Sequence, residues 1–406
     1  MKILMINQPI GNRGDESAHK GLVRKILSEF ENVQITVLFC GNIQHSVDQF
    51  NVNDPRVEYV NIKPAKAFGS TYKKCLLKGH YLLWHIHPTV RKIKSYYKDC
   101  DFVLNAPGGI CMGGFQAWIH LFFLKMAFIC NKKVVYYGRS FGPFPTRTPE
   151  NRRFKELSME FLQSFSFLSI RDQKTEKLAR ELSIDYIPTV DSAFLDNTHV
   201  AVPSALSDLI NGERYMIFVP NLLVWHYAYK DITDKKTVLD FYSGIIDIIR
   251  SKFGNIKILM LPQLFDSPLN DIIFFKELKT CHPDENMFVI DDTYSSDIQQ
   301  ALIKDATFVI GARYHSIVFS INQATPFIAL SYEHKISGLL ESLNKEDRII
   351  DISTIWSSEE DIQKCLHSVS DKLSDLQSDE ALQRKAKDKA NACFALFSDF
   401  VKKQEK

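Results

Sequence analysis

The chain has 406 residues, of which 45% are hydrophobic and 24% are charged, and its formal net charge is +2 at pH 7. This hydrophobic fraction is typical of globular proteins and excludes a disordered chain. The near-neutral charge argues against a nucleic-acid-binding protein, which usually carries a marked basic excess. At roughly 150 residues per domain, the length predicts two or three domains.

The sequence carries no signal for export, for membrane insertion or for a structural metal. Its first 17 residues lack the apolar core and cleavage site of a signal peptide. No apolar run reaches the roughly 18 residues that a membrane span needs. The eight cysteines are scattered and form no Cys-x-x-Cys pair, which disfavours zinc and iron–sulfur sites. We therefore expect a cytoplasmic protein without a metal or a bound cofactor.

Apolar runs alternate with polar, helix-forming stretches in two series. The first series predicts strands at 2–7, 33–40, 57–62, 101–107, 132–138, 165–172 and 184–190, with helices at 150–163 and 173–182. The second predicts strands at 215–221, 255–263, 287–292, 306–311 and 325–332, with helices at 238–253, 295–303 and 335–343. Such alternation is typical of parallel sheets covered on both faces.

We therefore expect an α/β protein of two Rossmann-like domains with a cleft between them. The boundaries that we predict are 1–200 for the first domain and 212–360 for the second, followed by a helical segment over 361–406 that packs back on the first domain. Ligands of such folds bind at the carboxyl ends of the strands, where the strand order reverses. The residues directly after each strand are therefore the candidate site residues.

The loop after the first predicted strand, residues 8–17, is rich in small and turn-forming residues. Backbone N–H groups at a helix start bind carboxylate, phosphate or sugar oxygens. We expect Asn12, Gly14 and Asp15 to contact a ligand there, and the structural alternative is that Asp15 or Ser17 caps the helix. The loop has no Gly-x-Gly-x-x-Gly pattern, so it gives little support to a dinucleotide site.

Two further loops follow predicted strands of the first domain. Gly108 and Gly109 permit a ligand to approach the backbone closely, or they only form a tight strand-to-helix turn. Arg139 ends the apolar strand 132–138, and its planar guanidinium matches the oxygens of a carboxylate or phosphate. The alternative role for Arg139 is a salt bridge between domains.

The second domain carries the most informative group. Arg313 and His315 follow the predicted strand 306–311 at the start of a helix, where the helix dipole favours anions. Glu333 and Lys335 follow the next strand, again at a helix start. Two adjacent parallel strands would place Arg313, His315 and Lys335 along one edge of the sheet. This spacing predicts a site for an anionic ligand.

The order of these motifs resembles that of the polysaccharide pyruvyl transferases. The resemblance spans roughly residues 3 to 340, and its most specific part is Arg-x-His followed by Lys about twenty residues later. The motifs concerned are Asn12-Arg13-Gly14-Asp15, Gly108-Gly109, the loop at Arg139, Ser169-Ile170-Arg171-Asp172, Asp191-Ser192-Ala193-Phe194, Gly311-Ala312-Arg313-Tyr314-His315 and Tyr332-Glu333-His334-Lys335.

The resemblance implies a fold similar to that of B-type glycosyltransferases. It also implies transfer of pyruvate from phosphoenolpyruvate to two hydroxyls of a sugar, which yields a cyclic ketal and free phosphate. In this scheme Arg139 and Arg313 bind the donor's anionic groups, and His315 and Lys335 exchange protons or neutralise charge on the departing phosphate. The first domain would bind the sugar acceptor and the second domain the donor.

The segment 59–98 contains nine basic residues and no acidic ones, with interleaved aromatic residues. It is either a solvated basic face or a surface for anionic lipid headgroups or a lipid-linked sugar. The second alternative predicts peripheral contact with the inner face of the membrane.

Two other functions remain open at this stage. One is a nucleotide-sugar-dependent glycosyltransferase of the same architecture, because seven residues separate Glu333 and Glu341, which gives a Glu-x7-Glu pattern. The other is a non-catalytic hinged protein that binds an anionic sugar in the cleft. Fold analogy alone does not separate these functions.

Overall fold

The chain folds around two large parallel β-sheets in this computed structural model. The structure describes residues 1–404 apart from residues 42, 44–46, 48–49, 115, 227, 266–269 and 292. The contacts divide the chain into two units. Unit 1 comprises Met1–Ile10, Ala18–Asp196 and Lys389–Lys406, and unit 2 comprises Gly11–Ser17 and Asn197–Asp388.

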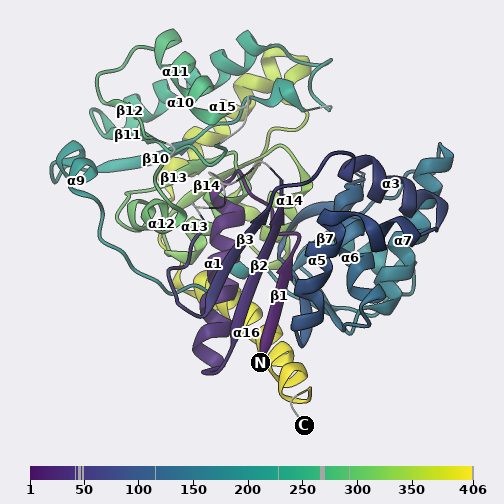
Figure 1. Ribbon diagram of the computed structural model, residues 1–406. Helices are drawn as coiled ribbons and strands as arrows, with labels where there is room; N and C mark the ends of the chain where they lie inside the picture. Colours follow the sequence, from purple (N-terminus) through teal and green to yellow (C-terminus); the bar gives the residue numbers. More distant parts are fainter. Residues whose placement is uncertain are drawn as a thin grey trace. The chain divides into compact units, whose positions relative to one another are not determined.

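The main sheet of unit 1 has the strand order β3-β2-β1-β4-β6-β8-β9, and all its pairs are parallel. Figure 1 draws β1, β2 and β3 side by side in purple. The strands are β1 Lys2–Ile6, β2 Gln34–Cys40, β3 Val57–Ile62, β4 Phe102–Asn105, β6 Val134–Tyr136, β8 Phe167–Ile170 and β9 Ile187–Pro188. All seven predicted strands are confirmed. Strand β3 has its predicted bounds, and the other six are shorter than predicted. The order reverses between β1 and β4, which makes this the switch point of unit 1.

Helices cover both faces of this sheet. On one face, six helices share a single apolar cluster with the strands. These are α3 Phe68–Lys78, α4 Leu82–Ile86, α5 Pro88–Asp99, α6 Trp118–Ile129, α7 Pro149–Ser164 and α8 Gln173–Glu181. On the other face, Phe397 packs against Phe102, Tyr137 and Phe167. Burial of both faces explains why β1 and β4 are continuous apolar runs rather than alternating ones.

A second, two-stranded parallel sheet in unit 1 was not predicted. It pairs β5 Gly108–Gly113 with β7 Arg139–Gly142. The sequence analysis was therefore wrong to end an apolar strand at Arg139, because β6 stops at Tyr136 and Arg139 begins a new strand. A Cβ atom on Gly113 would lie 2.5 Å from the carbonyl oxygen of Gly142. Only glycine permits this close approach of the two backbones, and a hydrophobicity pattern does not register it.

The sheet of unit 2 has the order β12-β11-β10-β13-β14-β15 and is also fully parallel. Its strands are β10 Tyr215–Val219, β11 Lys257–Met260, β12 Met287–Val289, β13 Val309–Gly311, β14 Phe327–Ser331 and β15 Ile349–Asp351. Five were predicted, and β15 was not. Numbered in chain order, the arrangement is that of a Rossmann sheet, with the switch point between β10 and β13.

Seven helices belong largely to unit 2. One face of its sheet shares an apolar cluster with α10 Lys235–Phe253, α11 Asp271–Cys281 and α15 Glu359–Ser374. The others are α9 Ser204–Ile210, α12 Ser296–Lys304, α13 Tyr314–Asn322 and α14 His334–Ser342. None of the helices in the described part of the chain is long and apolar enough to cross a membrane.

The predicted single helical segment at the carboxyl terminus is two helices. Five residues that belong to no helix follow α15, and α16 Glu380–Lys402 begins after them. The carboxylate of Asp379 accepts the N–H of Leu382 at 2.8 Å and forms an ion pair with the ammonium of Lys345. Aspartate favours such a helix start over a helix interior, because its side chain competes for backbone N–H groups.

A buried histidine makes the stability of unit 1 sensitive to pH. His19 lies in helix α1 Arg13–Glu29 and is fully buried. Its Nδ1 lies 3.0 Å from Oε1 of Gln8, and its Nε2 lies 2.8 Å from the hydroxyl of Tyr59. Burial, aided by the charges of Lys20 and Arg24, lowers the pKa of His19 to about 3. The imidazole is therefore neutral in the folded protein at all ordinary pH values.

We predict that acidification destabilises unit 1 through His19. Below its unfolded pKa of about 6.5 the unfolded chain binds a proton that the folded chain rejects, so the free energy of unfolding falls as the pH falls. Between pH 7 and pH 5 this group should cost about 2 kcal/mol. Denaturant unfolding of His19→Gln should show a loss smaller by that amount. His367→Gln, at an exposed histidine, serves as the control, and equal losses in both variants would contradict the assignment.

Candidate active site

The switch point of unit 2 positions the candidate site. The loops after β10 and β13 leave the sheet at the point where the strand order reverses, which is where ligands of such folds bind. The loop after β13 contains Arg313 and ends where α13 begins at Tyr314. The loop after β10 includes a 3-10 turn at Leu223–Trp225. The loop after the neighbouring strand β14 contains Glu333.

Arg313 is held by a carboxylate that the sequence analysis missed. The guanidinium forms an ion pair with Asp271, the first residue of α11, and lies 5.9 Å from the ring centroid of Trp225. Burial alone would lower the pKa of Arg313, but the carboxylate of Asp271 raises it above its ordinary value. The side chain keeps 15% of its surface exposed. Arg313 therefore carries a fixed positive charge that is still accessible.

Asp271 also fixes the loop before its own helix. Its Oδ2 accepts the backbone N–H groups of Gln263 and Leu264 at 3.0 and 2.9 Å. A buried carboxylate is tolerable only when its oxygens find such partners. No sequence motif marks Asp271, because its partners lie 42 residues away at Arg313 and seven to eight residues away in an irregular loop.

The segment Gly11–Ser17 joins unit 2 through this same loop. The N–H of Arg13 donates to the carbonyl of Gln263 at 2.8 Å, and the N–H of Phe265 donates to the carbonyl of Gly11 at 2.9 Å. The guanidinium of Arg13 lies 4.1 Å from the centre of the Phe265 ring. It also donates to the buried carboxylate of Glu16 at 2.7 Å.

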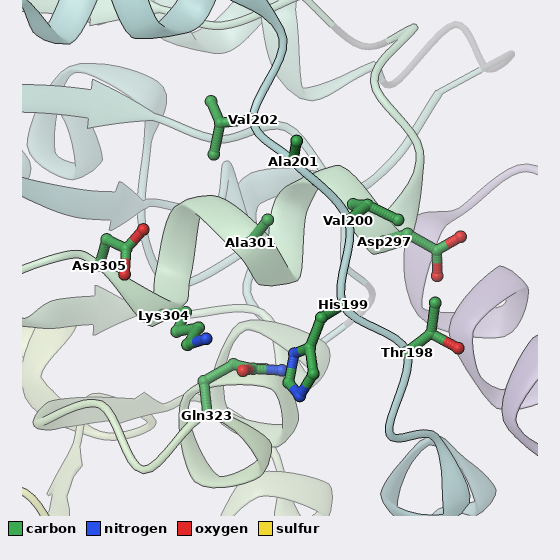
Figure 2. Close-up of a pocket in the computed structure, with 10 residues that line it drawn as sticks. All are labelled: Thr198, His199, Val200, Ala201, Val202, Asp297, Ala301, Lys304, Asp305 and Gln323. Carbon is green, nitrogen blue, oxygen red and sulfur yellow. The ribbon is translucent and has the colours of Figure 1, made fainter.

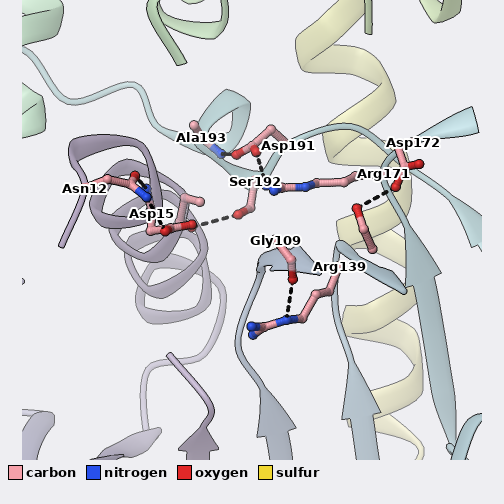
Figure 3. Close-up of polar contacts among 11 residues, drawn as sticks. Asn12, Asp15, Gly109, Arg139, Arg171, Asp172, Asp191, Ser192 and Ala193 are labelled. Carbon is pink, nitrogen blue, oxygen red and sulfur yellow. Dashed lines mark hydrogen bonds and ion pairs between the residues drawn. The ribbon is translucent and has the colours of Figure 1, made fainter. Parts of the chain in front are cut away.

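Asn12 caps helix α1, so the prediction of Asp15 or Ser17 as the cap was wrong. Oδ1 of Asn12 accepts the N–H of Asp15 at 2.7 Å, and the Asp15 carboxylate accepts the Asn12 amide in return (Figure 3). This reciprocal pair differs from a capping box, because the carboxylate at the third helical position accepts the side-chain amide of Asn12 and not its backbone N–H. Ser17 lies inside the helix.

Gly14 makes room for His315. A Cβ atom on Gly14 would lie 1.8 Å from Nδ1 and 2.0 Å from Cγ of the imidazole. No side chain larger than a hydrogen fits there unless the ring moves. His315 is the second residue of α13, and its ring is further bounded by the edges of Tyr314 and Phe319. The first turns of α1 and α13 therefore meet at this imidazole.

Glu333 and Lys335 form an ion pair with a separation of 3.3 Å. Their side chains are 18% and 34% exposed. Tyr332, beside Glu333, packs edge-on against His226 at 6.1 Å between ring centroids, and His226 packs against Trp225. Burial and the charge of Lys335 lower the pKa of His226, although Glu333 opposes them. His226 is therefore mostly neutral at pH 7.

Trp225 and His226 were not among the predicted site residues. They follow strand β10 at the carboxyl edge of the sheet. A rule about residues directly after a strand does not select them, because Leu222, Leu223 and Val224 stand between the predicted strand 215–221 and Trp225.

Unit 1 holds the other predicted residues around Arg139, which is 1% exposed. Its Nε donates to the carbonyl of Gly109 at 3.0 Å (Figure 3). Its Nη1 donates to the carbonyls of Asn7 and Ala106 at 2.8 and 2.9 Å. Its Nη2 contacts the sulfur of Cys111 at 2.9 Å. Asn7 and Ala106 follow β1 and β4, so Arg139 ties together the two sides of the switch point of unit 1.

The two glycines beside Arg139 differ in their surroundings. Gly108 has a φ of +153°, and a Cβ atom there would lie 2.5 Å from Cγ of Pro9. Gly109 would meet no atom within 4 Å. Gly108 is therefore required by the packing of the loop after β1, whereas the space beside Gly109 is open.

The remaining motifs of the sequence analysis form structural contacts within unit 1. The buried carboxylate of Asp191 pairs with Arg171 and accepts the N–H of Ala193 at 3.0 Å (Figure 3). Asp172 accepts the N–H of Thr175 at 2.8 Å and so caps α8. These residues hold the ends of β8 and β9 in place.

The predicted residues thus fall into two groups. In unit 2, Gly14 lies against His315, and the segment with Asn12 and Asp15 joins the loop that Asp271 ties to Arg313, whereas Glu333 and Lys335 form a pair of their own after β14. In unit 1, Arg139 lies with Gly108 and Gly109. Within the described ranges, no cluster of three or more His, Cys, Asp or Glu side chains has the geometry to hold a metal ion.

A separate cavity of about 160 Å³ lies elsewhere in unit 2. Figure 2 shows it between the extended segment 198–202 and helix α12, with His199, Lys304 and Gln323 on its lower side. None of the predicted site residues lines this cavity. It is therefore distinct from the candidate active site.

The comparisons with known proteins agree with this description. The family model described as "Polysaccharide pyruvyl transferase" matches residues 43–334, which is more than half of the chain. The amylovoran biosynthesis protein AmsJ of Erwinia amylovora is 21% identical over 401 residues, covering 87% of this chain and 89% of AmsJ.

Solved structures share the fold at low sequence identity. The UDP-GlcNAc 2-epimerase of Neisseria meningitidis, bound to UDP-GlcNAc, is 12% identical with a TM-score of 0.56 and covers 99% of this chain and 100% of its own. The trehalose 6-phosphate synthase of Burkholderia multivorans is 9% identical with a TM-score of 0.53 and covers 100% and 97%. The two Rossmann-like domains are thus those of B-type glycosyltransferases and related epimerases. With its motifs, its fold and the match of the family model taken together, the chain belongs to the polysaccharide pyruvyl transferase family.

Proposed function

We propose that this protein transfers pyruvate from phosphoenolpyruvate to two hydroxyls of a sugar and releases inorganic phosphate. The observation that carries the proposal is the group at the switch point of unit 2. There an accessible Arg313 and the imidazole of His315 stand at the start of α13, and Lys335 stands at the start of α14 on the next strand. This combination suits a small dianion that must also receive a proton.

The donor's charges have natural partners in this group. Phosphoenolpyruvate carries a carboxylate and a phosphate, and the N–H groups of a helix start together with a guanidinium bind such oxygens. Asp271 pairs with one end of the Arg313 guanidinium, and the Arg313 side chain keeps 15% of its surface exposed. All four partners of Arg139 lie in unit 1, and its role in binding the donor stays a prediction.

The reaction needs one proton donor and two proton acceptors. Protonation of the donor's methylene carbon lets the first hydroxyl attack the neighbouring carbon, and that hydroxyl gives up its proton. Loss of phosphate then breaks the carbon–oxygen bond, and the second hydroxyl attacks and closes the ketal. One hydroxyl proton replaces the one delivered to carbon, and the other leaves with phosphate. His315 and Lys335 are the candidates for these transfers.

The acceptor that we propose is a sugar of a bacterial exopolysaccharide or capsule, or its lipid-linked precursor. The family description and the name of the AmsJ relative support a role in polysaccharide biosynthesis. A lipid-linked acceptor would bring the enzyme, in the cytoplasm, to the inner face of the membrane. Asn12, Asp15 and Glu333 offer the polar side chains that would contact sugar hydroxyls or the donor.

The choice of donor tests the proposal directly. The purified protein, incubated with phosphoenolpyruvate and a panel of lipid-linked or aryl glycosides, should release inorganic phosphate and add the mass of a pyruvyl ketal to one of them. Release of UDP or GDP from a nucleotide sugar would instead identify a glycosyltransferase. Binding of ligands without turnover of any donor would identify a non-catalytic sugar-binding protein. Either of these outcomes would overturn the proposal.

Replacement of His315 should remove most of the turnover. A residue that transfers a proton in the transition state contributes about 10²- to 10⁴-fold to the rate, so His315→Ala should lower kcat by that factor. Thermal unfolding should be little changed, because the ring is only half-buried. His367→Ala, at an exposed histidine of α15, is the matched control. Normal turnover by His315→Ala would refute a catalytic role.

Gly14→Ala should impair the same step by displacing the imidazole. The added methyl group would overlap the ring of His315, so kcat should fall by at least about tenfold while the KM for phosphoenolpyruvate changes less. Gly69→Ala, in α3, is the control, because a Cβ atom there meets no atom within 4 Å. In a His315→Ala background Gly14→Ala should have little further effect. Additive losses in the double variant would show that Gly14 acts otherwise than through His315.

A further inference from the structure

Helix α4 exposes two large apolar side chains. Leu82 is 82% exposed and Ile86 is 70% exposed, the two highest values among the large hydrophobic residues of the described chain. They stand four residues apart, so they share one face of the helix. Between them Trp84 is 3% exposed and packs against Phe122, with ring centroids 4.9 Å apart. Trp84 therefore anchors α4, and the anchored helix presents the apolar pair outward.

The surroundings of this pair are basic. From Tyr59 to Lys98 the chain has nine basic residues and no acidic one. Helix α4 contacts both α3 and α5. Exposed cations lie close in sequence to the apolar pair on both sides, with Lys78 four residues before Leu82 and Arg91 and Lys92 shortly after Ile86.

Two contacts fold the start of this segment against α5. The N–H of Ala65 donates to the hydroxyl of Thr89 at 2.8 Å, and Nε2 of His87 lies 3.3 Å from the carbonyl oxygen of Lys66. They bring the exposed Lys66 beside the junction of α4 and α5. Lys73 is different, because it pairs with Glu150 at 2.6 Å. The exposed cations that lie nearest to the apolar pair along the chain or at the junction of α4 and α5 are Lys66, Lys78, Arg91 and Lys92, and we call these four with Leu82 and Ile86 the α4 face.

We infer that the α4 face docks on an anionic lipid bilayer. Leu82 and Ile86 enter the boundary between headgroups and acyl chains, and the four cations contact anionic headgroups. Charge complementarity favours this occupant over a second copy of the chain, since two such faces brought together would oppose cation to cation. The inference rests on the proposed function only for the reason why the protein docks. The α4 face is the surface that would bring the enzyme to a lipid-linked acceptor.

The test is co-sedimentation of the full chain with vesicles of phosphatidylcholine, with and without phosphatidylglycerol. The unchanged protein should bind the anionic vesicles and not the neutral ones. Leu82→Ser/Ile86→Ser should weaken that binding by at least about tenfold, because two large apolar side chains no longer enter the bilayer. Lys78→Gln/Arg91→Gln/Lys92→Gln should weaken it at low salt, and the remaining binding should depend less on salt.

Ile232→Ser/Leu396→Ser is the matched control, because these residues are 52% and 50% exposed and do not belong to α3, α4 or α5. It should bind like the unchanged protein. Absence of binding to anionic vesicles, or equal binding by all variants, would overturn the inference. So would a dimer in light scattering that Leu82→Ser/Ile86→Ser converts to a monomer, since the face would then join two copies.

This result is separable from the proposed function. With a water-soluble aryl glycoside, the α4-face variants should release phosphate from phosphoenolpyruvate at the unchanged rate. Vesicle binding without phosphate release would refute the proposed function and leave the docking face intact. Phosphate release without vesicle binding would do the reverse.

Discussion

The buried carboxylate of Asp271 is the contact on which the candidate active site depends. It takes a charge out of water, which is costly unless every oxygen is satisfied. Here one oxygen meets Arg313 and the other accepts the N–H groups of Gln263 and Leu264. The same loop receives the backbone of Gly11 and Arg13. A single side chain thus fixes an arginine after β13, the loop after β11 and the start of α1.

Each unit has an arginine at its switch point, and the two arginines are held by different kinds of partner. In unit 2, Arg313 is bound on one edge by a carboxylate and keeps part of its surface accessible. In unit 1, Arg139 is fully buried and donates to three carbonyls and a thiol sulfur. Carbonyl oxygens hold a guanidinium without cancelling its charge, so Arg139 stabilises the loops while it keeps the local potential positive. Direct anion contact therefore suits Arg313 better than Arg139.

Much of the fold could be predicted from the sequence because strands of a parallel sheet are buried on both faces. They appear as uninterrupted apolar runs, and polar residues at their ends point to the site. The same signal fails for β5 and β7, whose pairing depends on the close approach of glycines rather than on apolar side chains. It also fails for the break before α16, where the local competition of Asp379 for N–H groups decides the helix start.

The site was predictable only in part for a related reason. Arg313, His315 and Lys335 are polar residues directly after apolar strands, so a rule about strand ends finds them. Asp271 has no such position: it becomes a site residue only because the fold brings it to Arg313, 42 residues away. The role of Gly14 could not be predicted from the sequence either, because it lies in having no side chain where the ring of His315 packs.

The pairing of charges bears on how an anion would be bound. Arg13 is paired with Glu16, Arg313 with Asp271 and Lys335 with Glu333. Each carboxylate fixes a cation and at the same time offsets its charge, so these three cations alone add little net attraction for a dianion. The first turns of α1 and α13 meet at His315, so the positive ends of two helix dipoles lie at the same place. Selectivity for a dianion would then come from fixed geometry at two helix starts more than from an excess of positive charge, which accords with a chain whose net charge is only +2.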